Sequence, residues 1–297
     1  MGVQRLLVVG AGMMGADIAL LCARNELTVN CHDINLAQLG KARDHILMRS
    51  SRDVNKGRRS DDEEQASLRR LSFSTELAAA AADADFVIEA AVENLDVKRS
   101  LFADLDRLTP PHTILATNSS SFVSSKLADA TGRASQVCNV HFFNPALVMQ
   151  CAEIVAGPDT SSETIDIATA LVRQLGKTPI ILNKEIPGFI ANRLLNAVRD
   201  EAIFLYESGV GSVETIDAAC RMALGYPMGP FELMDLTGID IGYLSKIARY
   251  DETQDPRDAP SKSVTELVDR GHLGRKTRRG WYIYDEDGRR ISPSATR

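Results

Sequence analysis

The stretch Arg5-Leu6-Leu7-Val8-Val9-Gly10-Ala11-Gly12-Met13-Met14-Gly15 decides the fold of this chain. A short apolar run leads directly into Gly-x-Gly-x-x-Gly, and residues 16–23 continue with a helical pattern. In such a strand–turn–helix unit the glycines allow a tight turn, a close approach of backbone to pyrophosphate, and close packing of helix on strand. Free N–H groups at the helix start would face the phosphates. We therefore expect a dinucleotide site that is contacted by Gly10, Gly12, Met13, Met14 and Gly15.

An acidic residue after the second strand gives the glycine motif its context. Residues 28–32 indicate a strand that ends at Asp33, 18 residues after Gly15. An acid roughly 20 residues past the glycines holds the ribose hydroxyls in folds of this kind. No arginine follows at positions 34–36 to meet a 2′-phosphate. The pattern predicts NAD as the cofactor; the alternative is a structural glycine turn beside a strand-end aspartate.

Composition and charge limit the classes of protein to which this chain can belong. A chain of 297 residues is long enough for two domains, at roughly 150 residues each. Its net charge of −6 argues against a nucleic-acid surface. No apolar run reaches the ~18 residues of a membrane span, and we expect no signal or transit peptide before the first strand. Five scattered cysteines without a CxxC pair predict reduced thiols, no metal site and a cytoplasmic location.

Residues 36–72 are polar and helical, about twice the length that the bare nucleotide-binding fold needs for this crossover. We expect two helices, broken near residues 55–57, with residues 60–63 capping the second. Arg49, Arg52 and Lys56 share one face of the first helix. These three residues form either a solvated basic face or a cradle for an anionic handle of a substrate.

Polar residues follow two further apolar strands. Residues 86–91 predict a buried parallel strand, which Glu93 closes before a helix that carries Lys98. The strand at 113–117 ends in the run Asn118-Ser119-Ser120-Ser121. Because ligands bind at the carboxyl ends of parallel strands, Glu93 and Lys98 are candidate cofactor contacts, or else solvated charges. The serines offer hydroxyls to a ligand, cap the next helix, or do both.

A histidine closes the next buried strand, within Val137-Cys138-Asn139-Val140-His141. Pro145 forces a break, and residues 148–155 predict a strand that contains Glu153, twelve residues after His141. Strand, turn and strand can bring the two side chains together. A carboxylate against an imidazole fixes its tautomer and stabilises its charged form, which makes a general base with an orienting partner. The alternative is a core histidine with satisfied hydrogen bonds.

The segment 183–188, Asn-Lys-Glu-Ile-Pro-Gly, ends the strand pattern and marks a domain boundary. We expect an α/β domain over residues 1–183, with a Rossmann-type doubly wound sheet and a helical-hairpin insertion at 36–72. A smaller all-α domain would follow over 184–297, with helices at 189–208, 213–222, 231–249 and 264–270. The long apolar helices suggest burial against a second copy, and therefore a homodimer through this domain.

Together these motifs resemble the short-chain 3-hydroxyacyl-CoA dehydrogenases, including the bacterial 3-hydroxybutyryl-CoA dehydrogenases. The resemblance runs from Val8 to Tyr284 and is specific because several motifs occur in a fixed order. They are the glycine motif, Glu89-Ala90-Ala91-Val92-Glu93-Asn94, Asn118-Ser119-Ser120-Ser121, His141-Phe142-Phe143-Asn144-Pro145, Pro187-Gly188-Phe189-Ile190-Ala191-Asn192-Arg193 and Gly225-Tyr226-Pro227-Met228-Gly229-Pro230.

The resemblance implies roles for individual residues. His141 matches the catalytic base and Glu153 its partner, while Ser120 matches a contact to both cofactor and substrate and Asn192 a residue that positions the substrate. Glu93, Lys98, Asn144 and Lys276 match cofactor contacts. Ser119 stands where threonine is usual, and residues 36–72 are poorly matched, which leaves the coenzyme A contacts of Arg49, Arg52 and Lys56 to the helix-face argument alone.

The expected activity is the reversible NAD-dependent oxidation of a (3S)-3-hydroxyacyl-CoA, as in fatty-acid β-oxidation. One alternative is a dehydrogenase of the same fold for a small hydroxy acid of the gulonate or carnitine type, without coenzyme A. The other is a non-catalytic NAD-binding protein, which would need neither His141 nor Glu153.

Overall fold

Two units make up the chain, residues 1–190 and residues 191–297. The computed structural model describes residues 2–293. The boundary lies between Ile190 and Ala191, just beyond the predicted break at residues 183–188.

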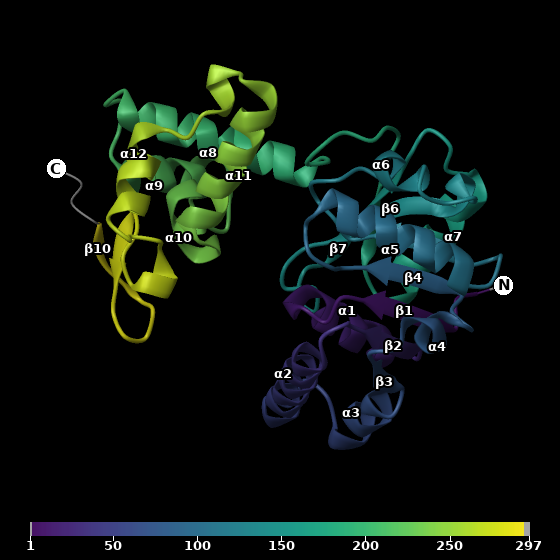
Figure 1. Cartoon of the computed structure of the whole chain (residues 1–297). Coiled ribbons are helices and arrows are strands. Elements are labelled where there is room, and N and C mark those ends of the chain that lie inside the picture. The colour runs from purple at the N-terminus through teal and green to yellow at the C-terminus, as the bar shows by residue number, and fades with distance from the viewer. Residues whose placement is uncertain (1, 294–297) are drawn as a thin grey trace. The chain divides into compact units, whose positions relative to one another are not determined.

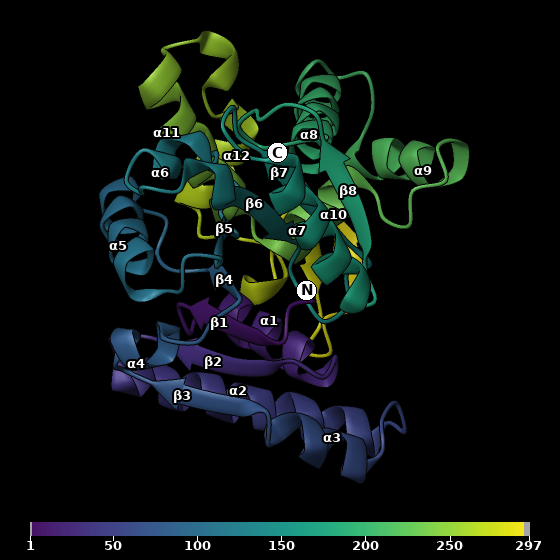
Figure 2. The same ribbon diagram turned by 90° about the vertical axis from the view of Figure 1, so that its right-hand side faces the viewer.

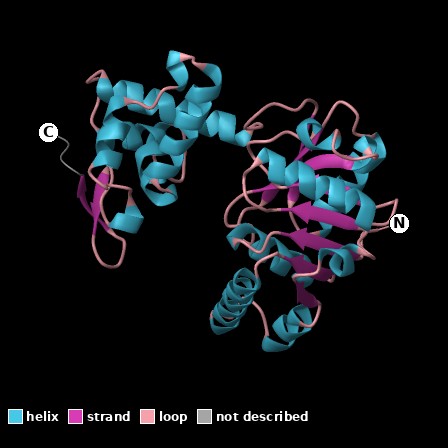
Figure 3. Ribbon diagram, in the orientation of Figure 1, coloured by secondary structure: helices cyan, strands magenta, loops and turns pink. Residues whose placement is uncertain are grey.

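One eight-stranded sheet organises the first unit (Figures 1 and 3). Its order is β3-β2-β1-β4-β5-β6-β7-β8. Every neighbouring pair from β3 to β6 is parallel, β7 runs antiparallel to β6, and β8 is parallel to β7. The strands are β1 (Arg5–Val9), β2 (Thr28–His32), β3 (Leu71–Ser74), β4 (Phe86–Glu89), β5 (Ile114–Thr117), β6 (Val137–Phe142), β7 (Cys151–Ala156) and β8 (Thr178–Leu182).

Helices cover both faces of this sheet, because successive side chains of a buried strand point to opposite faces. Leu6 and Val8 of β1 join a core with α1 (Met13–Arg24), α2 (Leu36–Asn55) and α7 (Ser162–Gln174). Leu7 and Val9 join a second core on the other side. That core contains α4 (Leu77–Ala81), α5 (Leu95–Leu108) and α6 (Ser125–Ala128). The prediction of a Rossmann-type doubly wound sheet is confirmed.

The insertion is the predicted pair of helices, α2 and α3 (Asp61–Leu68), which lie beside β3 in Figure 2. Ser60 starts α3 with a capping box, in which Ser60 Oγ accepts the Glu63 N–H at 3.2 Å and the Glu63 carboxylate accepts the Ser60 N–H at 2.7 Å. Arg24 of α1 pairs with Asp53 of α2 at 3.0 Å and with Glu64 of α3 at 2.9 Å. These ion pairs fasten the insertion to the sheet's helical layer.

The second unit is mostly helical. Its helices are α8 (Ala191–Glu207), α9 (Val213–Ala223), α10 (Pro230–Thr237), α11 (Ile239–Thr253) and α12 (Lys262–Asp269), and a hairpin of β9 (Tyr282–Tyr284) and β10 (Arg290–Pro293) follows. Short 3₁₀ turns occupy Ala134–Gln136 in the first unit and Pro256–Asp258 and Arg275–Thr277 in the second. Phe231, Trp281 and Tyr282 are central to the core of this unit.

Several expected element bounds were wrong. The helix expected over 231–249 is two helices, because Gly238 has φ +100° and breaks it. The strand expected from residue 148 begins at Cys151, since the Val148 and Met149 N–H groups turn back onto the Pro145 carbonyl. The β9–β10 hairpin was not expected at all, because its apolar alternation is only a few residues long within a charged tail. In the described part of the chain no helix could cross a membrane.

Two buried aspartates organise the polar core of the second unit. Asp217 accepts hydrogen bonds from the Phe231 and Glu232 N–H groups at 2.9 and 3.1 Å. Asp235 accepts the Trp281 and Tyr282 N–H groups, both at 2.9 Å, and the Tyr284 hydroxyl. Burial raises the pKa of Asp235 to about 6, against these hydrogen bonds, which favour the ionised form.

Candidate active site

The glycine turn lies where the strand order of the sheet reverses, between β1 and β4. This crevice at the carboxyl ends of the strands is the ligand position in open α/β sheets. Gly10 has φ +100°, and a Cβ added there would lie 2.5 Å from the Ala90 carbonyl oxygen. A Cβ added at Gly15 would lie 1.8 Å from the Gly10 carbonyl oxygen. Both positions therefore require glycine, for the turn and for close packing of helix on strand.

The residues around this turn fit a bound dinucleotide. Gly12 caps α1 without a side-chain hydrogen bond, and a Cβ added at Gly12 would meet no atom within 4 Å. The space beside Gly12 at the N-terminus of α1 is thus open, and a helix N-terminus is where the first N–H groups of a helix can bind an anion. Asp33 follows β2, and its Oδ2 accepts the Ala11 N–H at 2.9 Å. The same carboxylate accepts the Asn35 N–H, so Asp33 braces the turn that follows β2.

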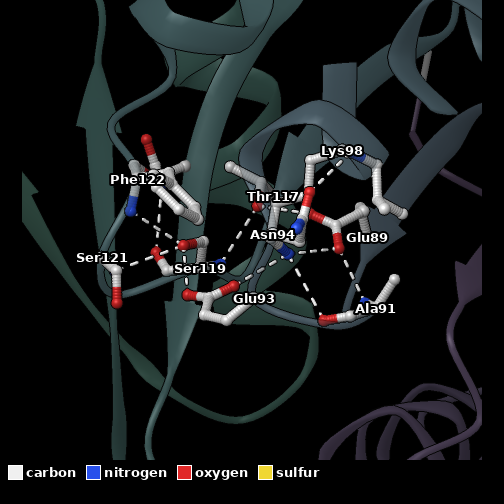
Figure 4. Close-up of polar contacts among 11 residues, drawn as sticks. Glu89, Ala91, Glu93, Asn94, Lys98, Thr117, Ser119, Ser121 and Phe122 are labelled. Carbon is white, nitrogen blue, oxygen red and sulfur yellow. Dashed lines mark hydrogen bonds and ion pairs between the residues drawn. The ribbon is translucent and has the colours of Figure 1, made fainter. Parts of the chain in front are cut away.

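A buried ionic network lies at the ends of β4 and β5 (Figure 4). Glu89, at the end of β4, pairs with Lys98 Nζ at 2.6 Å, and Glu93 Oε2 lies 3.0 Å from the same nitrogen. Glu89 Oε2 also accepts the Thr117 hydroxyl at 2.6 Å, from the end of β5. Lys98 is only 1% exposed, whereas the Glu93 side chain is 42% exposed. Of the predicted cofactor contacts in this region, Glu93 is the accessible one.

The serine run after β5 is held in place from two sides. Ser119 donates its hydroxyl to Glu93 Oε1, and Ser119 Oγ accepts the N–H groups of Ser121 and Phe122. Asn139 of β6 donates to the Ser119 and Phe122 carbonyls. Ser120 itself is half-buried. Its backbone is therefore fixed by its neighbours.

His141 and Glu153 lie directly opposite each other on β6 and β7. His141 Nδ1 is 2.9 Å from Glu153 Oε2, and both side chains are buried. Because an ionised carboxylate can only accept, this contact places the proton of a neutral imidazole on Nδ1 and leaves Nε2 with its lone pair. Such an arrangement can take a proton at Nε2 and stabilise the resulting imidazolium through Glu153.

The segment before α8 encloses this pair. Phe189 is buried, with φ +49°, and its ring centroid is 5.5 Å from that of His141. The Ile190 N–H donates to Glu153 Oε1 at 3.0 Å, so both carboxylate oxygens are held. Glu185 anchors the segment by accepting the Ser125 N–H at the start of α6 at 3.2 Å.

The other predicted site residues are more scattered. Asn144 is exposed after β6. Asn192, in the first turn of α8, and Lys276, paired with Asp240 at 2.6 Å, belong to the second unit. Arg49 Nη2, on α2, lies 3.7 Å from the buried Asp17 of α1, whereas Arg52 of α2 and Lys56, which directly follows the last residue of α2, are exposed. Arg52 and Lys56 are therefore accessible to a ligand, whereas Arg49 already has an ion-pair partner inside the protein.

Sequence reasoning did not single out Glu89, Thr117 and Asn139 as site residues, although all three are fully buried. Glu89 carried a usable signal, because a charge inside the apolar run 86–91 has to be paired. The Ile190 contribution is a backbone N–H and leaves no signal in residue identity.

The fold and these residues define an NAD-dependent dehydrogenase. The family model for the NAD-binding domain of 3-hydroxyacyl-CoA dehydrogenase matches residues 5–186, and the model for the C-terminal domain of the same family matches residues 188–284. The chain belongs to the 3-hydroxyacyl-CoA dehydrogenase family, as the sequence motifs indicated.

Individual relatives agree with this assignment. The chain is 36% identical over 286 residues to "Probable 3-hydroxybutyryl-CoA dehydrogenase" of Bacillus subtilis, covering 96% of this chain and 99% of that one. It is 39% identical over 289 residues to the mitochondrial hydroxyacyl-coenzyme A dehydrogenase of Sus scrofa, covering 95% and 91%. The crystal structure of (S)-3-hydroxybutyryl-CoA dehydrogenase PaaH1 from Ralstonia eutropha superposes with a TM-score of 0.88 at 36% identity, covering 96% and 100%.

Proposed function

We propose that this protein oxidises short-chain (3S)-3-hydroxyacyl-CoA substrates such as 3-hydroxybutyryl-CoA reversibly, with His141 as the base. The observation that carries the proposal is the buried contact of 2.9 Å between His141 Nδ1 and Glu153 Oε2. Names of the relatives support the choice of a short acyl chain.

In the proposed mechanism, His141 Nε2 takes the proton of the substrate's C3 hydroxyl. Glu153 stabilises the imidazolium across Nδ1, and the Ile190 N–H keeps the carboxylate oriented. Ser120 and Asn192 are the proposed partners of the substrate oxygen, a role that rests on the family resemblance. NAD, when bound, supplies the acceptor for the hydride from C3. In the reductive direction the protonated His141 returns its proton to the carbonyl oxygen.

Single-turnover reduction of acetoacetyl-CoA by NADH tests the mechanism. His141→Ala should slow turnover by roughly 10²–10⁴-fold, the usual contribution of a general acid–base group. Glu153→Gln keeps the shape but not the charge, and it should also lower kcat. NADH binding should change little in either variant, because the glycine turn is separate from this pair. Wild-type turnover in His141→Ala would refute the base assignment, and equal turnover of a small 3-hydroxy acid without coenzyme A would refute the substrate class.

We further propose that Arg52 in the last turn of α2 and Lys56 just after this helix bind the phosphates of coenzyme A. Both side chains are exposed at the C-terminal end of α2, in an insertion that the bare nucleotide-binding fold does not require. Arg49 would contribute less directly, since its guanidinium also pairs with Asp17.

A homodimer through the second unit is proposed as well. Its support is an apolar groove of about 210 Å³ between α8 and α10, lined by Leu194, Leu195, Val198, Tyr226, Met228, Pro230 and Leu233. Sedimentation of the wild-type protein checks the proposal, and a monomer at micromolar concentration would contradict it.

A cytoplasmic location is supported by five free cysteines, and burial raises the pKa of the Cys31 and Cys138 thiols to about 12.

A further inference from the structure

The main chain at Ala11, inside the glycine turn, has a side-chain partner for each of its two polar groups. Ala11 is fully buried. Its N–H donates to Asp33 Oδ2 at 2.9 Å, and its carbonyl oxygen accepts the side-chain amide of Gln38 at 2.8 Å. Asp33 follows β2 and Gln38 lies in the first turn of α2. Two residues that are close in sequence therefore hold the same residue of the turn.

Four hydrogen-bonded residues close a ring around this contact. The Asn35 N–H donates to Asp33 Oδ1 at 2.9 Å. Asn35 is the N-cap of α2, and its side-chain oxygen accepts the Gln38 N–H at 3.4 Å. Gln38 then donates to Ala11, and Ala11 donates to the other oxygen of Asp33. The cap of α2 thus fixes the backbone from which the Gln38 side chain reaches the turn.

The Gln38 contact sets the orientation of the peptide group between Ala11 and Gly12. In a planar trans peptide the C=O and the following N–H point in opposite directions. A hydrogen bond from Gln38 to the Ala11 carbonyl therefore directs the Gly12 N–H away from the Gln38 amide. Without this donor a buried carbonyl would lose its partner, which favours rotation of the peptide toward another donor. Such a rotation would also change the direction of the Gly12 N–H.

We propose that Gln38 is a positioning residue for the pyrophosphate of the cofactor. It does not contact the cofactor. It acts through the Ala11–Gly12 peptide, which belongs to the turn that backbone groups use to approach pyrophosphate in this fold. This inference rests on the proposed dinucleotide contacts of the glycine turn.

Ligand binding to the full-length protein without acyl-CoA tests the proposal, with NADH followed by fluorescence and other ligands by displacement of NADH. Gln38→Met keeps the length and helix propensity of the side chain but removes its donor. It should raise the Kd of NADH and of ADP-ribose about three- to tenfold, the effect of one lost hydrogen bond. The Kd of adenosine, which has no phosphate, should change little. Wild-type affinity for ADP-ribose, or an equal loss of affinity for adenosine, would overturn the proposal.

A second substitution should change stability and affinity in opposite directions. Gln38 is the third residue of α2 after the Asn35 cap, where a glutamate completes a capping box and interacts favourably with the helix dipole. Gln38→Glu should therefore leave Tm unchanged or raise it. Its carboxylate cannot donate to the Ala11 carbonyl, so NADH affinity should fall at least as far as in Gln38→Met. If Tm and affinity fell together in both variants, the role of Gln38 would be structural and the proposal would be overturned.

Gln136→Met is the matched control for the lost hydrogen bond. It removes a contact of the same kind and length, from the Gln136 side-chain amide to the Pro111 carbonyl at 2.8 Å. NADH affinity should remain that of the wild type. An equal loss of NADH affinity in Gln136→Met and Gln38→Met would overturn the proposal, because the effect would not depend on the turn.

Gly12→Ala tests the turn itself. A Cβ added at Gly12 would meet no neighbouring atom within 4 Å, but it would fill part of the open space beside the N-terminus of α1. Tm should therefore stay near the wild-type value while NADH binding weakens. Wild-type NADH affinity in Gly12→Ala would remove the turn from the proposed cofactor site and the inference with it. A loss in Gly12→Ala but not in Gln38→Met would overturn the positioning role alone.

Discussion

Asp33 has two tasks at the site, since it carries the charge expected beside the ribose and also accepts the Ala11 and Asn35 N–H groups. A 2′-phosphate placed near this carboxylate would be repelled. Two unit charges ~4 Å apart interact by about 4 kcal/mol at an effective dielectric near 20. Even a third of that energy corresponds to about a tenfold difference in affinity.

We therefore expect kcat/KM to favour NADH over NADPH by at least about tenfold. Asp33→Asn should reduce this ratio, because the amide removes the repulsion. Asp85→Asn is the matched control, since Asp85 also accepts two backbone N–H groups, from Gln4 and Arg5. Equal kcat/KM values for the two cofactors in the wild type, or an equal change of the ratio in both variants, would contradict the assignment.

Some residues of the site could be anticipated from sequence and others could not. A histidine and a glutamate on strands joined by a short turn can be expected to meet, and they lie 2.9 Å apart. Asn139 could not be assigned a site role, because a buried asparagine that donates to the Ser119 and Phe122 carbonyls looks like any strand residue until the loop is placed.

At the scale of helices and strands, the sequence predicted helix ends where a capping motif or a turn glycine marked them clearly. The break near Gly57, which has φ +64°, and the capping box at Ser60 predicted the end of α2 and the start of α3 correctly. Gly238 was not expected to break a helix, because an isolated glycine in a helical pattern is often tolerated. Its φ of +100° depends on tertiary packing, which the local pattern does not contain.

The basic residues at the end of α2 should affect the KM for the acyl-CoA substrate. Arg52→Ala/Lys56→Ala should raise KM for acetoacetyl-CoA about three- to tenfold, since two exposed phosphate contacts each contribute up to about 1 kcal/mol. The increase should shrink as salt rises, because exposed charges are screened. Lys41→Ala/Arg43→Ala removes the same charge from the first half of α2 and is the control. If both double variants raise KM equally, the effect is one of net charge, and α2 is a solvated basic face.

At the scale of the whole molecule, the two units differ in the side chains that make up their cores. The first unit has extensive apolar cores on both faces of its sheet, and the second has one core built on an aromatic cluster, with the buried Asp217 and Asp235 hydrogen-bonded to it. Trp281 is the chain's single tryptophan and lies fully buried in the second unit, so its fluorescence reports the unfolding of that unit alone.

Asp235 should make the second unit less stable as pH rises. Burial raises its pKa from 3.8 to about 6 in the folded state, so the folded chain holds the extra proton between these values. The stabilisation, at most about 3 kcal/mol, is present below about pH 4 and is lost as pH rises through about 6. Denaturation followed by Trp281 fluorescence should show a steeper fall in the free energy of unfolding between pH 4 and 6 in wild type than in Asp235→Asn. Parallel curves would show that Asp235 titrates normally.

The hydrogen bond from Ile190 to Glu153 has a consequence for mutational drift. Its donor belongs to the main chain, so any amino acid except proline at position 190 can supply it. A codon change there would alter the side chain and leave the orientation of the Glu153 carboxylate intact. Part of the site's geometry thus depends on the path of the main chain, which few single substitutions change.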